Sequence, residues 1–587
     1  MSTLSIPEEP SVFGHKPGLF LLFFTEMWER FSYYGMRVLL VLFLVSETAG
    51  GGWGWTRAAA LQLFALYTGL VYVTPIFGGM IADRFLGYRK AVLCGAFLMT
   101  LGHASLAMES KVSFYAGLVL LILGNGLFKP NISSIVGQLY AKETDKKDGA
   151  YTIFYMGINA GAFLGIMLCG YIGEKTQWNY GFGLAGVFML LGMIMFQLGQ
   201  SIFGELGLKA IPQTTSESSK DSEESAVVVR DRLIVIGILS FFTIFFWMAF
   251  EQAGGSMTIF ANDYTSRILT GSAATVFFWI NTLLTVVPLG ILTWVLLRLV
   301  AATKSRIPLS NASIVLSFII IWGIAIWMLN KEYNMRAYEI AISPPPSTAP
   351  DSDASPAMIS TNIQSDRALQ TGQKIHVVDI EGQGGKGKIK VLTDAQAEEY
   401  TTDLEATVTR VKQNETEVTA SWFQILNSFF IIAFAPLFSR IWESRLNPSA
   451  PVKFGIGLIL LGLGFGVLAI GSNGIAKGAA TAQVSMWWLI VAFLFHTLGE
   501  LCVSPVGLSY VSKLAPARLV GLMFGIWFLA SAIANSLAGF TGSYIDKISE
   551  EYGLTTFFLI YTIIPVVAGI VILGMTRMIR KMMHGID

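Results

Sequence analysis

Long apolar runs alternate with short polar segments along almost the whole chain, and this pattern predicts an all-α protein that crosses a membrane many times. A helix needs about 20 mostly apolar residues to span a bilayer. About fourteen runs meet this length, which predicts about fourteen transmembrane helices. They lie at residues 17–46, 56–82, 90–108, 112–140, 150–173, 181–205, 232–261, 274–300, 308–330, 419–441, 454–473, 484–513, 520–545 and 554–576.

Two longer polar segments interrupt the pattern and divide the chain. Residues 206–231 predict a cytoplasmic linker after a first bundle of six helices at 1–205. Residues 331–418 predict an outer insertion, in which KIHVVDI and KIKVL flank a glycine-rich turn as in a β-hairpin. The polar stretch DAQAEEYTTDLEATVTRVK that follows predicts a helix leading back to the membrane. The remaining divisions are the seventh helix at 232–263, two inserted helices at 264–330, and the rest of the second bundle with the tail at 419–587.

The basic residues are distributed unequally between the two sets of short loops, and this predicts the orientation. Lys and Arg gather in cytoplasmic loops of membrane proteins. With the N-terminus inside, the inner loops carry about three times as many basic residues as the outer ones. We therefore expect both termini in the cytoplasm, with the protein in the plasma membrane, the inner membrane of a bacterium.

Composition supports lipid as the solvent and excludes several classes of protein. The chain of 587 residues is 53% hydrophobic and only 13% charged, against about 25% charged residues in soluble domains. A net charge of +1 argues against a nucleic-acid partner. In the segment GQGGKGK, Ile389 stands where a phosphate-binding loop needs Ser or Thr. We therefore expect no nucleotide, no metal and no other cofactor, and no enzyme.

The first apolar run contains charged residues that a membrane helix normally excludes. An ionisable group at mid-membrane costs at least about 2.5–3.5 kcal/mol, so such groups usually face a cavity and have a partner. Glu26, Arg30, Tyr33 and Arg37 fall within an arc of about 60° at helical spacing, and Glu29 flanks it. These residues predict one polar stripe in which Glu26 and Arg30 can pair directly. The alternative is a structural ion pair that only locks the bundle.

Further polar residues lie deep in other runs. Lys129 precedes Pro130 in the fourth run, Glu251 lies in the seventh, and Glu500 lies near the middle of a later run. The first half of the chain thus supplies buried bases and the second half supplies buried acids. A cavity between the halves would suit a zwitterion, with its carboxylate toward Arg37 and Lys129 and its ammonium toward Glu500.

Several motifs resemble those of one transporter family. The segment EMWERFSYYG (Glu26–Gly35) closely resembles the helix-one signature of the proton-dependent oligopeptide transporters, a branch of the major facilitator superfamily. GGMIADRFLGYRK (Gly78–Lys90) resembles the superfamily's loop between helices two and three, and YTIFYMGINAGAFLG (Tyr151–Gly165) resembles the family's helix five. FEQAGGSM, WFQILNSFFIIAFAPLF and GELCVSPVGLS resemble its helices seven, eight and ten.

The resemblance implies the major facilitator fold and roles for individual residues. Proton coupling is implied for Glu26, Glu29, Arg30 and Glu251. Binding of peptide termini and backbone is implied for Arg37, Lys129, Asn159, Asn427 and Glu500. Tyr33, Tyr72, Tyr155, Ser504 and Trp527 would line the pocket, and Asp83 and Arg84 belong to the gating loop.

The chain departs from the family pattern in one place. Matching WFQILNSFF to helix eight leaves residues 264–418 as an insertion after helix seven. Many bacterial relatives place two extra helices between helices six and seven instead. Neither inserted helix carries a central charge, which favours a peripheral packing role.

These features together predict a symporter that imports di- and tripeptides with protons by alternating access. One alternative keeps the fold but carries another small solute, such as nitrate or an organic anion, because fold does not determine substrate. A receptor or an intramembrane enzyme is a third alternative. The sequence offers no Ser/His/Asp or metal-ligand constellation for that third case.

Overall fold

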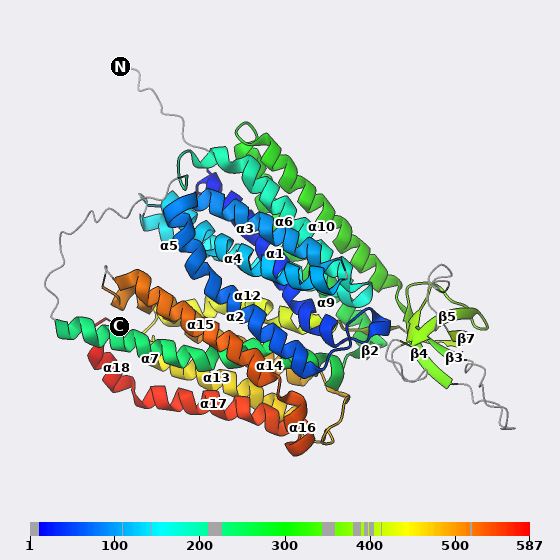
Figure 1. The fold of residues 1–587 in the computed structure, drawn as a ribbon. Helices are drawn as coiled ribbons and strands as arrows, with labels where there is room; N and C mark the ends of the chain where they lie inside the picture. Colours follow the sequence, from blue (N-terminus) through cyan, green and yellow to red (C-terminus); the bar gives the residue numbers. More distant parts are fainter. Residues whose placement is uncertain are drawn as a thin grey trace.

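The computed structural model describes residues 11–108, 110–141, 144–208, 226–342, 359–379, 389–392, 397, 404–412, 414–445, 447–516 and 519–586. Within these ranges the chain forms two helical bundles and a small β-sheet at one end (Figure 1). We call the end that carries the sheet the outer end, following the predicted orientation. The predicted glycine-rich turn lies outside the described residues, and so does the earlier stretch SPPPSTAPDSDASP at 343–356.

The first bundle consists of six long helices. Their bounds are α1 Pro17–Val45, α2 Arg57–Ile81, α3 Tyr88–Leu106, α4 Lys111–Leu139, α5 Thr144–Lys175 and α6 Trp178–Gly199. Short turns join or extend them, namely η1 Thr48–Gly50, η2 Ala82–Leu86 and η3 Gln200–Phe203. Helix α1 is enclosed by the others, and 27 of its residues from Pro17 to Leu44 are buried, charged groups included.

The second bundle begins with a broken helix. Helix α7 (Ala226–Phe250) continues through η4 Glu251–Gly254, α8 Ser256–Ile259 and η5 Phe260–Tyr264. The later elements are η6 Ala420–Gln424, α12 Ile425–Glu443, α13 Ala450–Gly471, α14 Trp487–Leu514, α15 Val520–Gly542, α16 Ile545–Tyr552, α17 Leu554–Gly574 and α18 Thr576–Met582. Helix α15 packs along α2, so these two helices form one seam between the bundles (Figure 1).

Within the described residues, twelve helices are long and apolar enough to cross a membrane. Helices α1 and α3, which the sequence also predicts to span, are not among the twelve. Helix α1 carries four charged residues, Glu26, Glu29, Arg30 and Arg37, which lower its apolar character. The predicted total of fourteen spans therefore stays a prediction.

The two inserted helices form an antiparallel hairpin, α9 (Ser272–Thr303) and α10 (Pro308–Asn334). Although they follow the first helix of the second bundle in sequence, they pack against the first bundle. Ser310 donates to the carbonyl of Met195 in α6 at 2.7 Å, and the ring of Phe318 lies 5.7 Å from that of Phe24 in α1. The hairpin therefore lies at the periphery, as the sequence predicts, but beside the other half of the chain (Figure 1).

Beyond the hairpin, the outer insertion forms a five-stranded sheet in the order β4-β3-β7-β5-β6. The bounds are β3 Arg336–Ile342, β4 Ile359–Ser365, β5 Lys374–Asp379, β6 Ile389–Val391 and β7 Leu404–Val411. Strands β5 and β6 pair antiparallel, which confirms the pairing of the predicted β-hairpin. The predicted polar helix is wrong over residues 404–411, which form strand β7. Ala406 and Val408 alternate into a small core of their own there, and this packing outweighs local helix propensity.

Two short ribbons connect the sheet and hairpin to the second bundle. Strand β2 (Ile268–Thr270) pairs antiparallel with β8 (Glu415–Glu417), and β1 (Thr265–Ser266) pairs parallel with β9 (Val484–Ser485). The chain thus leaves the second bundle after η5 and returns to it at η6 through adjacent strands.

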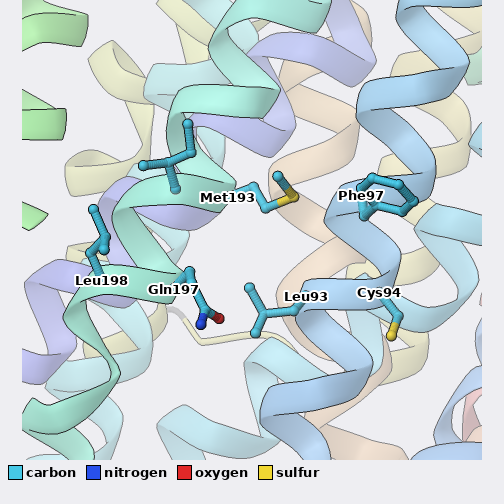
Figure 2. A pocket seen from close by; sticks show the side chains of 7 residues that line it. Leu93, Cys94, Phe97, Met193, Gln197 and Leu198 are labelled. Carbon is cyan, nitrogen blue, oxygen red and sulfur yellow. The ribbon is translucent and has the colours of Figure 1, made fainter.

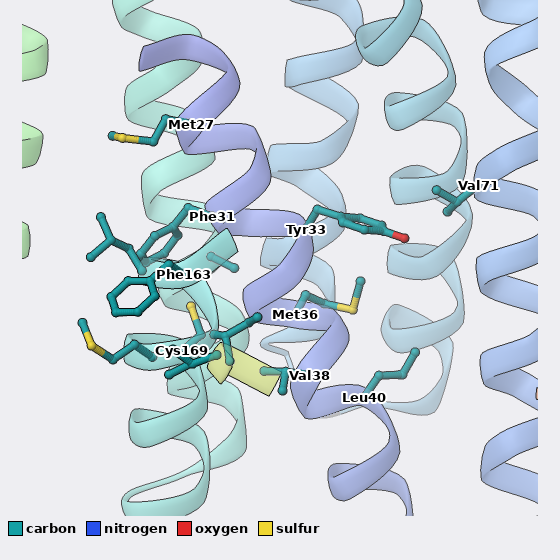
Figure 3. Packing of buried hydrophobic residues seen from close by; sticks show 14 of the residues in the cluster. Met27, Phe31, Tyr33, Met36, Val38, Leu40, Val71, Phe163 and Cys169 are labelled. Carbon is teal, nitrogen blue, oxygen red and sulfur yellow. The ribbon is translucent and has the colours of Figure 1, made fainter. Parts of the chain in front are cut away.

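Glycines let the helices of the first bundle approach closely, as is common in membranes. At Gly161 and Gly165 of α5, a Cβ would collide with the carbonyl oxygens of Met27 and Phe31 in α1. Phe31, Phe163 and Cys169 fill the adjacent core (Figure 3). Close backbone contact between α1 and α5 therefore fixes the position of the charged stripe of α1 relative to α5.

We expect Gly165→Ala to destabilise the protein by about 1–3 kcal/mol, because the added methyl overpacks this contact. Thermal unfolding in detergent would show a lower midpoint temperature. The matched control is Gly237→Ala in α7, since no atom lies within 4 Å of a Cβ there. An unchanged midpoint for Gly165→Ala would contradict the close packing of α1 and α5.

Candidate transport site

The polar stripe of α1 forms a buried ion cluster. Arg30 Nε lies 2.7 Å from Glu26 Oε1 and 2.8 Å from Glu29 Oε2, and only the contact with Glu26 has hydrogen-bond geometry. Asn125 of α4 donates to Glu29 Oε1 at 2.9 Å. The side chains of Arg30, Glu26 and Glu29 are at most 4% exposed. Two carboxyl groups therefore share one guanidinium in a site that water hardly reaches, an arrangement that suits the uptake of one proton.

A second buried ion pair joins the two bundles. Arg37 of α1 pairs through Nη2 with Glu251, at the point where α7 breaks into η4. The guanidinium also lies over the ring of Phe64 in α2, 5.4 Å from its centre. The sequence predicts that Arg37 binds the carboxylate of a peptide. In this structure the carboxylate of Glu251 is its partner instead.

Lys129 and Tyr72 form the basic wall of the site. The ammonium of Lys129 in α4 lies 4.4 Å from the centre of the Tyr72 ring in α2. Among the described residues, Lys129 has no carboxylate within ion-pair distance. Tyr72 interacts electrostatically with Lys129 and also with Glu500 of the other bundle. Tyr72 is therefore within electrostatic range of both Lys129 and Glu500.

Glu500 of α14 forms the acidic wall. Asn427 of α12 donates to Glu500 Oε2 at 2.8 Å and contacts Thr497 Oγ1 at 3.2 Å. Tyr155 of α5 interacts electrostatically with Glu500 from the first bundle. Glu500 thus has amide and aromatic neighbours but, within the described part of the chain, no basic residue beside it.

Comparison with known proteins identifies the family. The model of the POT family matches residues 89–217 and 396–560. The uncharacterized transporter YclF of Bacillus subtilis is 32% identical over 99% of this chain and 98% of its own length. The chain belongs to the POT family. Its POT relatives include the peptide transporter YePEPT of Yersinia enterocolitica and a di-/tripeptide transporter of Lactococcus lactis, each 28% identical over at least 98% of both chains.

A solved structure shares the POT fold. The crystal structure of a peptide transporter POT in complex with sulfate is 25% identical and superposes with a TM-score of 0.67. The match covers 98% of this chain and 97% of that one. The predicted membership of the oligopeptide transporters and the major facilitator fold are thereby confirmed.

The other predicted site residues of this POT protein occupy different surroundings. Tyr33 is buried, and its hydroxyl points toward α2 and has no hydrogen-bond partner among the described residues (Figure 3). Asn159 donates to the backbone of Tyr155 at 3.1 Å. Trp527 packs within the second bundle against Phe454, with ring centres 6.2 Å apart.

Three further predicted residues lie nearer the edge of the site or away from it. Ser504 is half-buried one turn beyond Glu500 in α14. Asp83 and Arg84 lie in η2, where both are exposed and Asp83 accepts from the hydroxyl of Tyr88 at 2.8 Å. The gating-loop residues therefore do not take part in the buried clusters.

Asn125, which holds Glu29 from a neighbouring helix, is not among the residues predicted from the sequence. A signal was available, because Asn125 lies one helical turn before Lys129 and therefore on the same face of α4. Thr497, whose hydroxyl accepts a hydrogen bond from the amide of Asn427, is not among them either. A small polar side chain in an apolar helix carries too little signal to be singled out.

The bundles also meet at a second place on the outer end. Glu174 at the end of α5 accepts from the backbone N–H groups of Ala420 and Ser421 at 2.9 Å each, which caps η6. Lys175 forms an ion pair with Glu417 at 2.8 Å, and Arg267 approaches the same carboxylate at 3.0 Å. These contacts close the outer end beside α5.

A separate apolar hollow of about 500 Å³ lies between α3 and α6 (Figure 2). Its lining is Leu93, Cys94, Phe97, Met193, Ile194, Gln197 and Leu198, with no ionisable carboxylate or base. It therefore lacks the groups that a charged solute requires, and it lies apart from the transport site.

Proposed function

We propose that this POT-family chain is a symporter that imports di- and tripeptides with protons by alternating access. The observation that carries the proposal is that Tyr72 contacts Lys129 of the basic wall and is also within electrostatic range of Glu500 in the acidic wall. A free peptide carries a carboxylate at one end and an ammonium at the other, and each wall complements one end. The names of the matching relatives support peptides over nitrate or other solutes.

Proton coupling is assigned to the cluster of Glu26, Glu29 and Arg30. Protonation of one glutamate leaves Arg30 with a single carboxylate partner and removes a buried charge, which changes the stability of the surrounding helix contacts. Glu251 is assigned a related role at the outer closure, because protonating it releases Arg37. The released Arg37 can then take the peptide carboxylate as a bidentate partner.

Tyr33, Tyr155, Asn159, Asn427, Ser504 and Trp527 are assigned to the walls of the pocket. The closed outer end corresponds to the inward-facing state of the cycle, in which the two bundles rock about the central site. We further propose that the protein lies in the plasma membrane with both termini in the cytoplasm. The proton gradient supplies the energy, and neither a cofactor nor an enzymatic step is needed.

Uptake into proteoliposomes tests this proposal directly. We expect labelled dialanine to accumulate when the outside is more acidic than the inside, and tripeptides to compete for this uptake. Equal accumulation without any proton gradient would refute the coupling. Inhibition by nitrate but not by peptides would overturn the assigned substrate in favour of the other solute class.

A further inference from the structure

A buried lysine lies at the inner end of the second bundle, opposite the β-sheet. Lys453 is the fourth residue of α13, and only 8% of it is exposed. Its ammonium lies 4.5 Å from the centre of the Trp442 ring, in the last turn of α12. A lysine this close to the end of a membrane helix ordinarily extends to the lipid headgroups. Lys453 instead stays against an indole of its own bundle.

Within the described part of the chain, Lys453 has no counter-ion. Its electrostatic neighbours are the thiol of Cys502 and a second cation, Lys513, both in α14. The first turn of α13 contains no acidic residue, although a helix N-terminus carries the positive end of the helix dipole and favours acids. A buried charge without a partner is costly. The positive potential around Lys453 is therefore left without an anion.

The same place contains an unused hydrogen-bond donor. Nε1 of Trp442 is buried and has no partner among the described residues. Buried polar groups without partners are rare in folded proteins. An indole N–H and an ammonium can only donate, so neither can satisfy the other. A negatively charged acceptor is the group that both of them lack.

The position in the membrane favours phosphate over other anions. Helix α12 ends, α13 begins and α14 ends at the inner end, which places Lys453 near the level of the inner lipid headgroups. Arg440, Arg445 and Lys513 are exposed at this end. Basic clusters at the cytoplasmic surface of a membrane attract anionic phospholipids, and lysine binds phosphate oxygens as a point charge.

We propose that Lys453, Lys513 and the indole N–H of Trp442 form a binding site for a phosphate group, which we call the inner phosphate site. Two sources supply this group at the inner surface, the headgroup of an anionic phospholipid and inorganic phosphate. The site shares no residue with the proposed peptide and proton sites. The inference therefore goes beyond the proposed symport and does not depend on it.

Thermal unfolding of the full-length protein in detergent tests the site, because a ligand of the folded state raises the midpoint temperature. One arm adds phosphatidylglycerol, and the other exchanges chloride for inorganic phosphate at constant ionic strength. Stabilisation only by phosphatidylglycerol assigns the site to a lipid, and stabilisation by inorganic phosphate assigns it to the free anion. No stabilisation by either probe would overturn the site.

We expect Lys453→Gln to raise the concentration of probe needed for half of the stabilisation by about tenfold or more, since it removes a charged hydrogen bond. The matched control is Lys331→Gln. Lys331 also stacks on a tryptophan, 5.4 Å from the centre of the Trp327 ring, but lies in the last turn of α10 at the outer end. This variant should respond to the probe like the wild type. Equal responses of Lys453→Gln and the wild type would show that the probe binds elsewhere.

The midpoint without any probe separates a ligand site from a packing role. If the ammonium of Lys453 only stabilises the bundle by stacking on Trp442, Lys453→Gln should unfold at a lower temperature. At an unoccupied phosphate site, the same change removes an unpaired charge and its repulsion from Lys513. We therefore expect an equal or higher midpoint, and a lower one would overturn the site in favour of packing.

Trp442→Phe tests the indole donor separately. Phenylalanine keeps an aromatic ring beside the ammonium but removes the N–H group. We expect the half-stabilising concentration of probe to rise by about fivefold, as for the loss of one ordinary hydrogen bond. An unchanged concentration would overturn the role assigned to Trp442.

Failure of the inner phosphate site and failure of the proposed function have different signatures. Proton-driven uptake of dipeptide by a wild-type protein that responds to neither probe would refute the site alone. A response that depends on Lys453, without proton-driven uptake, would support the site and refute the symport. Because Lys453 lies outside the walls of the transport site, Lys453→Gln should leave the recognition of peptide termini unchanged.

Discussion

Glu26→Gln should abolish the accumulation of dipeptide under an inward proton gradient yet leave peptide exchange between the two sides. Glutamine keeps the shape of the side chain but cannot bind and release a proton. Arg30 would then retain Glu29 as its only carboxylate partner throughout the cycle. Proteoliposomes measure both activities, with accumulation driven by a pH jump and exchange driven by unlabelled peptide inside.

The control for this change is Glu47→Gln, because Glu47 is exposed on the outer connection between α1 and α2. This variant should accumulate peptide at the wild-type rate. Accumulation by Glu26→Gln above the outside concentration would show that Glu26 is not the essential proton carrier. Glu29→Gln would then be the next variant to test, because Glu29 shares the same guanidinium.

Glu500→Gln should weaken dipeptide binding by about 10- to 100-fold. A hydrogen bond to a charged group contributes about 1.5–3 kcal/mol, and about 1.4 kcal/mol corresponds to a tenfold change in affinity. The decisive observation is the loss of discrimination between termini. Acetylation of the peptide amine should weaken binding to the wild type strongly and to Glu500→Gln hardly at all.

Lys129→Gln should show the converse behaviour, losing discrimination between a free and an amidated peptide carboxyl group. Its matched control is Lys453→Gln in α13, since Lys453 also stacks on an aromatic ring, 4.5 Å from the centre of Trp442. Binding can be followed by thermal shift or by competition for uptake. If amidation weakens binding equally in the wild type and in Lys129→Gln, Lys129 does not bind the carboxylate.

The sequence predicts the ion cluster of α1 well because the interaction is local. Glu26 and Arg30 are one turn apart, so helical geometry alone brings them together. The partner of Arg37 cannot be predicted from helical spacing in the same way. Glu251 is 214 residues away, at the junction of α7 and η4, and meets Arg37 only through the packing of the two bundles.

Arg57 illustrates the same limit. At the beginning of an apolar run, an arginine ordinarily extends to the lipid headgroups, so nothing in its local sequence singles it out. Its acidic partners, Asp263 and Asp546, lie 206 and 489 residues along the chain, and its Nη atoms donate to them at 2.6 and 2.8 Å. Strand β7 was mispredicted for a related reason, because the sheet that pairs with it determines its conformation.

The position of the inserted hairpin has a consequence for how the halves of the chain recognise each other. Helices α9 and α10 belong to the second half in sequence, yet Ser310 and Phe318 attach them to α6 and α1 of the first half. The arrangement resembles an exchanged arm between subunits of a dimer. If the protein were expressed as two polypeptides divided within residues 209–225, the second fragment would carry its own docking arm, and we expect the fragments to co-purify as a complex.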